Sequence, residues 1–229
     1  MIGLEDIGLA RRRLRGVALR TPLVPCPRGG LDRTLYFKPE SLQPTGAFKL
    51  RGAYNKISSL SPEERRRGVV AHSSGNHAQA VAYAARALGT RAVIVMPREA
   101  PRVKLDATAA LGAEVVPVGA DSAERARRAE ELAVEHGYVP VPPYDDEVLI
   151  AGQGTIGSEI LEDLPEVDTV LVPVSGGGLI SGVAAAIKLT RPGVRVIGVE
   201  PKLAADARAS LKGGRLVEFP ADQVGRTVA

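Results

Sequence analysis

The chain has 229 residues, enough for one large or two small domains, and its 45% apolar and 24% charged residues exclude a disordered chain. The net charge is +4, but only 3% of residues are aromatic and the arginine clusters lie beside acids or on predicted helix faces, so we expect no nucleic-acid partner. We also expect no membrane partner and a cytoplasmic location, because no apolar run could span a bilayer and the first residues lack a signal-peptide pattern. Cys26 is the single cysteine, so no internal disulfide can form.

Strand-like and helix-like segments alternate along the chain, which predicts an α/β fold with parallel strands. Ser61 is expected to cap a short helix, with Pro62 in its first turn, Glu64 three residues after the cap and Gly68 at its end. Beyond it we predict strands at 69–71, 91–96 and 114–118, and helices at 77–88, 103–111 and 123–136, each helix closed by a glycine.

A second run of elements follows Pro142-Pro143, where we place a domain boundary. We predict a helix at 158–164, a strand at 169–174, a helix at 179–189, a strand at 194–199 and a helix at 203–211. The strand at 169–174 is continuously apolar, as expected when both faces of its sheet are covered.

A glycine-rich turn joins the strand at 169–174 to the next helix and reads Ser175-Gly176-Gly177-Gly178-Leu179. Several backbone N–H groups and the positive end of a helix dipole would meet there, which suits a phosphate. A tight turn alone would need one glycine, whereas three let the backbone approach a ligand closely. The Gly-Lys-Ser/Thr of a nucleotide P-loop is absent, so the sequence predicts a phosphate site of another kind.

Two other segments carry possible chemistry. Lys49 lies among small residues, and a lysine in a closed, poorly hydrated site can become an amine nucleophile. The alternative is an ordinary solvated lysine. The segment from Ser73 to His77 precedes a predicted helix, where backbone N–H groups suit a carboxylate, although Ser74 or Asn76 could instead simply cap that helix.

The segment 152–157, Gly-Gln-Gly-Thr-Ile-Gly, matches the G-x-G-x-x-G pattern of dinucleotide sites. The acid expected about 20 residues later is missing, because that region is the glycine turn. We therefore expect this segment to be structural and to lead into the helix at 158–164.

Together, the segments around Lys49, Ser73–His77 and Ser175–Leu179 resemble the pyridoxal-phosphate (PLP) enzymes of the serine/threonine dehydratase and serine racemase family. The resemblance extends from residue 19 to residue 229. It implies the α/β architecture of the fold type II PLP enzymes, with a small doubly wound domain (68–145) inserted into a large one (1–67 and 146–229). In that family a substantial stretch follows the position of Ala229, so we expect an incomplete large domain and poor PLP binding by this chain alone.

The resemblance also assigns roles to residues. Lys49 bonds to the PLP aldehyde and then removes the substrate α-proton, while Phe48 lies beside the pyridine ring. Asn76 hydrogen-bonds the PLP 3-hydroxyl. The PLP phosphate is held by Ser175, Gly176, Gly177, Gly178 and Leu179. The substrate carboxylate is bound by the loop of Ser73, Ser74, Gly75, Asn76 and His77.

The resemblance implies different roles for Ser74 and His77. In family members that racemise serine, a serine at the position of Ser74 acts on the cofactor face opposite the lysine, whereas many threonine dehydratases carry alanine there. His77 is expected to shape the loop rather than to act as a base.

A cation site is a further implication of the resemblance. Glu200, the Ala204 carbonyl and Asp206 match the divalent-cation site of serine racemase-like members, and such oxygen ligands suit Mg²⁺ or Ca²⁺. The alternative is a solvated acidic turn.

The resemblance implies a PLP-dependent dehydratase (ammonia-lyase) that converts L-threonine or L-serine to a 2-oxo acid and ammonia, and a homo-oligomer. A serine racemase-like bifunctional enzyme is the alternative favoured by Ser74 and by the pair Glu200 and Asp206. A cysteine-synthase-like enzyme fits less well, because His77 follows Asn76 where that branch usually has threonine. An inactive fragment or partner-binding subunit is the alternative from another class, supported by the missing C-terminal stretch.

Overall fold

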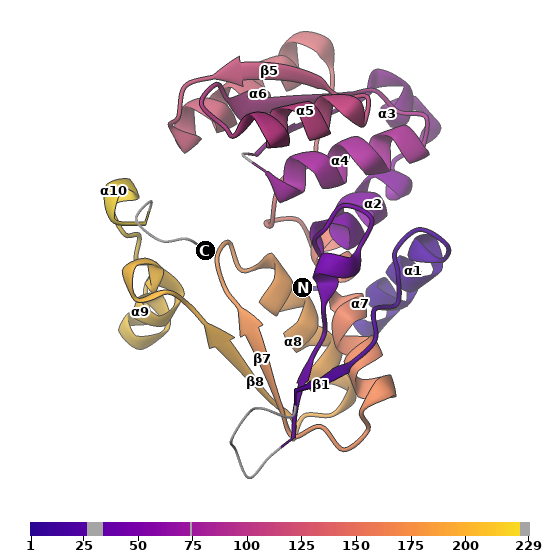
Figure 1. Cartoon of the computed structure of the whole chain (residues 1–229), viewed down its shortest axis with the longest axis vertical. Coiled ribbons are helices and arrows are strands. Elements are labelled where there is room, and N and C mark those ends of the chain that lie inside the picture. Colours follow the sequence, from indigo (N-terminus) through magenta and orange to yellow (C-terminus); the bar gives the residue numbers. More distant parts are fainter. Residues whose placement is uncertain (27–33, 74, 225–229) are drawn as a thin grey trace.

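The computed structural model describes residues 1–26, 34–73 and 75–224, which form an upper and a lower region in the view of Figure 1. The upper region contains a four-stranded sheet, and the lower region contains a two-stranded parallel sheet beside α7 (Glu147–Asp163). α2 (Lys49–Ser59) lies between the two regions and packs against helices of both. The expected α/β fold with parallel strands is confirmed.

The upper sheet has the strand order β5-β4-β3-β6, and all its neighbouring strands are parallel. α4 and α2 cover one face and α6 covers the other, so β4 is buried at all six positions. The elements of this region are α3 (Pro62–Arg67), β3 (Val69–His72), α4 (Asn76–Ala87), β4 (Ala92–Pro97), α5 (Arg102–Ala110), β5 (Glu114–Val118), α6 (Ser122–His136) and β6 (Val139–Pro140).

Local signals set the ends of these elements. The Ser61 hydroxyl accepts from the Glu64 N–H at 3.2 Å and the Glu64 carboxylate accepts from the Ser61 N–H at 2.8 Å, which confirms the expected capping box of α3. Gly137 ends α6 with a φ of +69°, a left-handed conformation that favours glycine.

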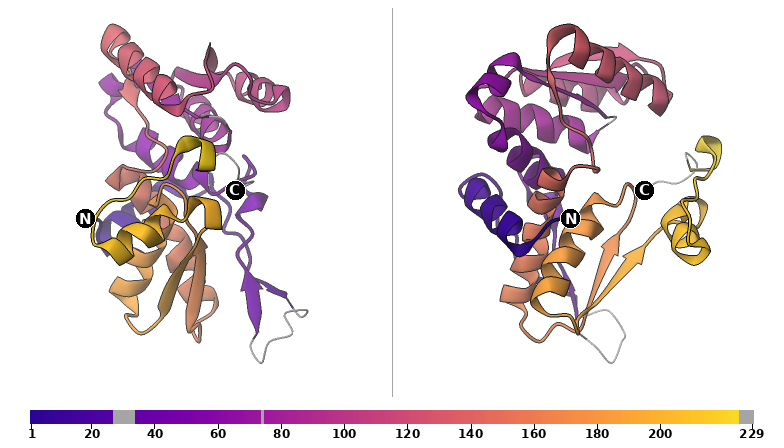
Figure 2. Two further views of the ribbon diagram at one scale, coloured as in Figure 1. Left: turned by 90° about the vertical axis from the view of Figure 1, so that its left-hand side faces the viewer. Right: turned by 180° about the vertical axis from the view of Figure 1, so that it is seen from behind.

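The lower region is arranged around α7, which packs along α8 (Gly178–Thr190), α2 and α1 (Leu4–Leu14). β7 (Thr169–Pro173) and β8 (Arg195–Val199) pair in parallel beside α8 (Figure 2). Val170 and Val172 of β7 join the core formed with α7 and α8, whereas the intervening Leu171 is 57% exposed. The expectation that both faces of this strand are covered is therefore wrong for the described residues, which cover one face only.

The remaining elements flank this region. β1 (Val24–Cys26) pairs antiparallel with β2 (Leu35–Phe37), and a 3-10 turn, η1 (Glu40–Leu42), follows. After β8 come η2 (Lys202–Ala204), α9 (Asp206–Gly213) and α10 (Ala221–Val224), so the helix expected at 203–211 is divided between η2 and α9. Within the described ranges, no helix is both long and apolar enough to cross a membrane.

The largest error of the sequence-based expectations concerns residues 147–157. The segment 152–157 does not lead into a helix at 158–164 but lies inside α7, which begins at Glu147. Asp146 caps this helix, because its Oδ1 accepts from the Leu149 N–H at 2.9 Å. Glycines are usually unfavourable within a helix, but here they allow neighbouring helices to approach closely.

Candidate active site

Lys49 is the first residue of α2, and its side chain is partly buried. Its Nζ donates a hydrogen bond to the carbonyl oxygen of Pro143 at 2.6 Å and lies 5.2 Å from the centroid of the Phe48 ring. Burial lowers the pKa of Lys49 to about 8, because desolvation disfavours the charged ammonium. A fraction of this amine is therefore neutral near physiological pH, as an amine nucleophile requires.

Phe48 is the N-cap residue of α2 and extends this surface toward α8. Its side chain packs against the buried apolar cluster of the lower region, to which α7, β7 and α8 all contribute. The aromatic residue beside the lysine thus belongs to the packing of the lower region.

The loop of residues 73–77 joins β3 to the start of α4. The Ser73 N–H donates to the Val95 carbonyl at 3.1 Å, and the Ser73 hydroxyl accepts from the Gly75 N–H at 3.2 Å. Asn76 begins α4 and is exposed, and none of the side chains that the structure describes caps this helix. The role expected for Ser74 concerns a residue outside the described ranges. The first turn of α4 therefore presents N–H groups that suit an anion.

His77 is only 2% exposed, and its Nε2 is hydrogen-bonded to the Val141 carbonyl oxygen at 2.9 Å. Burial lowers the pKa of His77 to about 3, and the nearby charge of Lys49 adds to the effect. The imidazole is therefore neutral at physiological pH, and its hydrogen bond fixes the start of α4. This geometry fits a residue that shapes the loop.

The glycine turn ends at the N-terminus of α8. Gly177 is the N-cap residue with a φ of +83°, and no side chain within the described ranges caps the helix. The first backbone bond of the helix runs from the Ser181 N–H to the Gly177 carbonyl at 2.9 Å. The N–H groups of residues 178–180 consequently have no acceptor within the helix, which leaves them suited to a phosphate.

One short segment, from Val141 to Tyr144, contacts all three motifs. The Val141 carbonyl binds His77 and the Pro143 carbonyl binds Lys49. Tyr144 packs so closely on the glycine turn that a Cβ atom at Gly176 would collide with its ring. The starts of α2, α4 and α8 are therefore gathered around this segment. The sequence indicated only a domain boundary at Pro142-Pro143. The contacts made here by backbone carbonyls could not be predicted, because every residue type has a backbone carbonyl.

Arg51, in the first turn of α2, holds that helix through a buried network that the sequence did not reveal. Its Nε and Nη2 bind the Glu40 carboxylate at 2.8 and 2.9 Å, and its Nη1 and Nη2 bind Glu159 of α7 at 2.6 and 2.9 Å. Lys38 also pairs with Glu159, at 2.7 Å. Paired carboxylates satisfy the planar guanidinium fork, so this network fixes α2, and with it Lys49, relative to α7.

The residues expected to bind a divalent cation lie together around the start of α9. Glu200 uses both carboxylate oxygens there, accepting from the N–H groups of Ala207 at 3.0 Å and Arg208 at 2.9 Å. Ala204 ends η2 and Asp206 begins α9. Within the described part of the chain, no group of three or more His, Cys, Asp or Glu side chains could hold a metal. The cation site stays a prediction.

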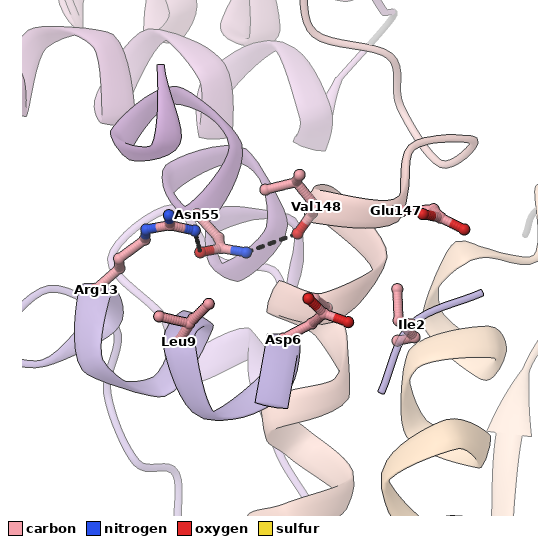
Figure 3. A pocket seen from close by; sticks show the side chains of 8 residues that line it. Ile2, Asp6, Leu9, Arg13, Asn55, Glu147 and Val148 are labelled. Carbon is pink, nitrogen blue, oxygen red and sulfur yellow. Dashed lines mark hydrogen bonds between the residues drawn. The ribbon is translucent and has the colours of Figure 1, made fainter. Parts of the chain in front are cut away.

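A cavity of about 120 Å³ lies elsewhere, between α1, α2 and the start of α7 (Figure 3). Its polar groups bind one another: Arg13 donates to the Asn55 side-chain oxygen at 3.2 Å, and Asn55 donates to the Val148 carbonyl at 2.6 Å. Its lining, taken from the described residues, includes none of the expected site residues. We therefore place the candidate active site at the 141–144 segment and not at this cavity.

Comparisons with known proteins show the family of the chain. A family model described as "pyridoxal-phosphate dependent enzyme" matches residues 14–228. L-threonine ammonia-lyase of Thermotoga maritima is 52% identical over 220 residues, a match that covers 94% of this chain and 54% of that protein. The chain thus spans about half the length of this curated relative.

Two solved structures are also similar to this chain. Maize serine racemase superposes with a TM-score of 0.93 at 40% identity, covering 95% of this chain and 67% of that one. A threonine deaminase from T.th. superposes with a TM-score of 0.90 at 43% identity, covering 96% of this chain and 72% of that one. Both the family and the arrangement of its helices and strands are thereby shown.

Proposed function

Because the chain belongs to the pyridoxal-phosphate-dependent enzyme family, we propose that it acts as an ammonia-lyase (dehydratase) that converts L-threonine or L-serine to a 2-oxo acid and ammonia. The observation that carries this proposal is Lys49, whose pKa is lowered to about 8 where the starts of α2, α4 and α8 meet. Similarity to an L-threonine ammonia-lyase supports the substrate class.

The residues present fit PLP. The cofactor needs an amine for its aldehyde and a donor-rich site for its phosphate. Lys49 provides the amine, and the uncapped start of α8 behind three glycines provides the N–H groups. Pro143 contacts Lys49 and the adjacent Tyr144 contacts the glycine turn, so the amine and the phosphate site lie beside one segment.

Each group has a distinct task in the proposed reaction. When bound, PLP supplies an electron sink that stabilises negative charge on the substrate α-carbon. The N–H groups at the start of α4 bind the substrate carboxylate and orient the bond to the α-hydrogen. The neutral amine of Lys49 accepts that proton at Nζ. Phe48 keeps the surface beside the amine apolar, and Asn76, the first residue of α4, would bind the cofactor's 3-hydroxyl.

An absorbance spectrum with added PLP tests the proposal directly. Since this chain alone is expected to bind PLP poorly, the spectrum is taken at saturating PLP, where we expect a weak band from PLP bonded to Lys49, its loss in Lys49→Ala, and its retention in Lys212→Ala, which changes an exposed lysine of α9. A 2-oxo acid assay with L-threonine and L-serine should likewise detect product with the wild type and with Lys212→Ala, but not with Lys49→Ala. A wild-type protein that shows neither band nor product would instead favour the inactive fragment.

A serine racemase-like activity is the second candidate, supported by similarity to maize serine racemase. Ser74→Ala should abolish racemisation of L-serine while largely preserving elimination. Racemisation that survives this substitution would show that Ser74 has no such role.

The other expectations remain part of this proposal. Cation binding at Glu200, Ala204 and Asp206 would be visible as a Mg²⁺- or Ca²⁺-dependent rise in melting temperature. A homo-oligomer would be visible by light scattering, and the proposed cytoplasmic location by cell fractionation. The division into a large domain (1–67 and 146–229) and a small domain (68–145) stays a prediction that limited proteolysis can test.

A further inference from the structure

Three glycines of α7, at positions 152, 154 and 157, have no task in the chemistry described above. Each is expected to cost about 1 kcal/mol relative to alanine within a helix, so a reason for them is needed. They belong to the segment that matched a dinucleotide motif, but they lie inside a helix and not in a loop. Each of them faces the backbone of a neighbouring helix.

Gly152 sets the contact between α7 and α2. A Cβ atom at this position would lie 2.6 Å from the Arg51 carbonyl oxygen and 2.7 Å from the Gly52 Cα. Gly52 makes the matching contact from the α2 side, since a Cβ atom added to it would lie 2.9 Å from the Leu149 carbonyl oxygen. Backbone atoms cannot rotate aside, so any larger residue must push the two helices apart.

Gly154 and Gly157 set the contact between α7 and α8. Cβ atoms there would lie 3.0 Å from the Gly182 carbonyl and 2.8 Å from the Val183 carbonyl. Successive helix residues are about 100° apart, so Gly154 and Gly157 share one face, while Gly152 lies on another. α7 therefore stands between α2 and α8 and contacts each through glycine.

We propose that α7 is a spacer that sets the distance between Lys49 and the phosphate-binding turn. α2 begins at Lys49 and α8 begins at Gly178, so a shift of either helix against α7 moves one of the two groups. The aldehyde and the phosphate of the cofactor are joined through a rigid ring and a short arm, so only a narrow range of separations of the two groups suits it. This inference rests on the proposed function, and it makes Gly152 and Gly157 positioning residues.

The contact of α7 with α2 and its contact with α8 can be tested separately without measuring activity. Pyridoxamine 5'-phosphate carries the phosphate but no aldehyde, so its Kd reports on the glycine turn. Borohydride reduction in the presence of PLP, followed by mass spectrometry, reports on bonding to Lys49. Gly157→Ala should weaken pyridoxamine 5'-phosphate binding by about tenfold, and Gly152→Ala should chiefly lower trapping on Lys49 at saturating PLP.

Ile94→Ala serves as a matched control, because it removes buried volume from β4 in the upper region and leaves the glycine contacts of α7 unchanged in sequence. It should lower the melting temperature as the glycine variants do but leave both readouts unchanged. If Gly157→Ala fails to fold, Gly154→Ala replaces it, since one of its two closest neighbours is the movable Ile7 side chain. Gly52→Ala similarly replaces Gly152→Ala, because its nearest neighbour is the end of the Gln153 side chain.

If the glycine variants, like Ile94→Ala, change neither pyridoxamine 5'-phosphate binding nor trapping on Lys49, α7 does not act as a spacer, and the proposed function is unaffected. A wild-type protein that traps no PLP on Lys49 would contradict the proposed function itself. The two failures are therefore distinguishable in one experiment.

Discussion

The upper and lower regions of this molecule are both built on parallel strands, yet they obtain their cores differently. In the upper region the sheet is central, with helices on both faces and a β4 that is buried throughout. In the lower region the described residues cover β7 and β8 on one face only, and Leu171 and Val199 are 57% and 51% exposed. There the central element is α7, which packs against α1, α2 and α8.

This difference shows where the positions of the proposed catalytic groups are set. The apolar sequence of β7 resembles that of a doubly covered strand, but among the described residues only helices on one side protect it. The positions of Lys49 and of the glycine turn depend instead on contacts between helices and on the buried Arg51 network. The lower region should therefore tolerate changes in its sheet and be sensitive to changes among its helices.

The largest expected effect is at Arg51. Arg51→Met leaves the partly buried carboxylates of Glu40 and Glu159 without their guanidinium partner, and breaking a buried pair in this way costs about 3 to 5 kcal/mol. Urea unfolding should report this loss, and Arg91→Met, which breaks the exposed pair with Glu114, should cost less than about 1 kcal/mol. Equal losses for the two variants would show that the network does not hold the lower region together.

The two sheets can be compared next. Ile94→Ala in the fully buried β4 should reduce the free energy of unfolding by about 2 to 5 kcal/mol, through lost burial and a residual cavity. Ile197→Ala in β8, where the side chain is 40% exposed, should cost much less, about 1 kcal/mol. Similar losses at both positions would remove the distinction between a covered and a half-covered sheet.

A smaller effect of opposite sign is expected at Gln153 of α7. Its side chain is fully buried, and its Nε2 and Oε1 have no hydrogen-bond partner within the described chain. Gln153→Met should therefore be neutral or stabilise the fold by about 1 kcal/mol.

The matched control is Gln43→Met. The buried amide of Gln43 donates to the Leu19 carbonyl at 2.8 Å and accepts from the Leu19 N–H at 2.9 Å. This variant should lose about 1 to 3 kcal/mol, because the partners of the amide are left unpaired. A loss at Gln153 as large as that at Gln43 would show that the Gln153 amide contributes to stability after all.

A further effect is the pH dependence contributed by Lys49. Its folded-state pKa of about 8 lies below its ordinary value of 10.5, so the unfolded chain binds more protons between these values. The penalty for burying the charge is full below about pH 8, and stability rises as the pH increases toward about 10.5. The stability gained by Lys49→Met should accordingly be larger at about pH 7 than at about pH 10.

Chemical labelling gives the same pKa by another route. Acetylation of Lys49 by acetic anhydride, followed by mass spectrometry, should be half-maximal near pH 8, compared with about 10.4 for a lysine peptide. A Lys49 profile that coincides with the peptide would contradict the desolvated site.

Much of the fold was predictable because its signals are local. The capping box at Ser61 and Glu64, the left-handed Gly137 and the apolar runs of β4 and β5 act over a few residues, and the structure follows them. The start of α7 was not predictable in this way. Its glycines weaken the helix locally, and the helices that compensate for them come from distant parts of the chain.

The candidate site, like the fold, has features that the sequence predicts and features that depend on tertiary contacts. The sequence by itself determined which residues carry chemistry: an amine at Lys49, donor-rich helix starts at Asn76 and Gly178, and a neighbouring aromatic at Phe48. Only the tertiary structure decided what surrounds them, namely the Pro143 carbonyl on Lys49, Tyr144 on the glycine turn, and Arg51 between Glu40 and Glu159. Residue type fixes what a side chain can do, whereas desolvation, carbonyl contacts and helix spacing depend on parts of the chain that meet only after folding.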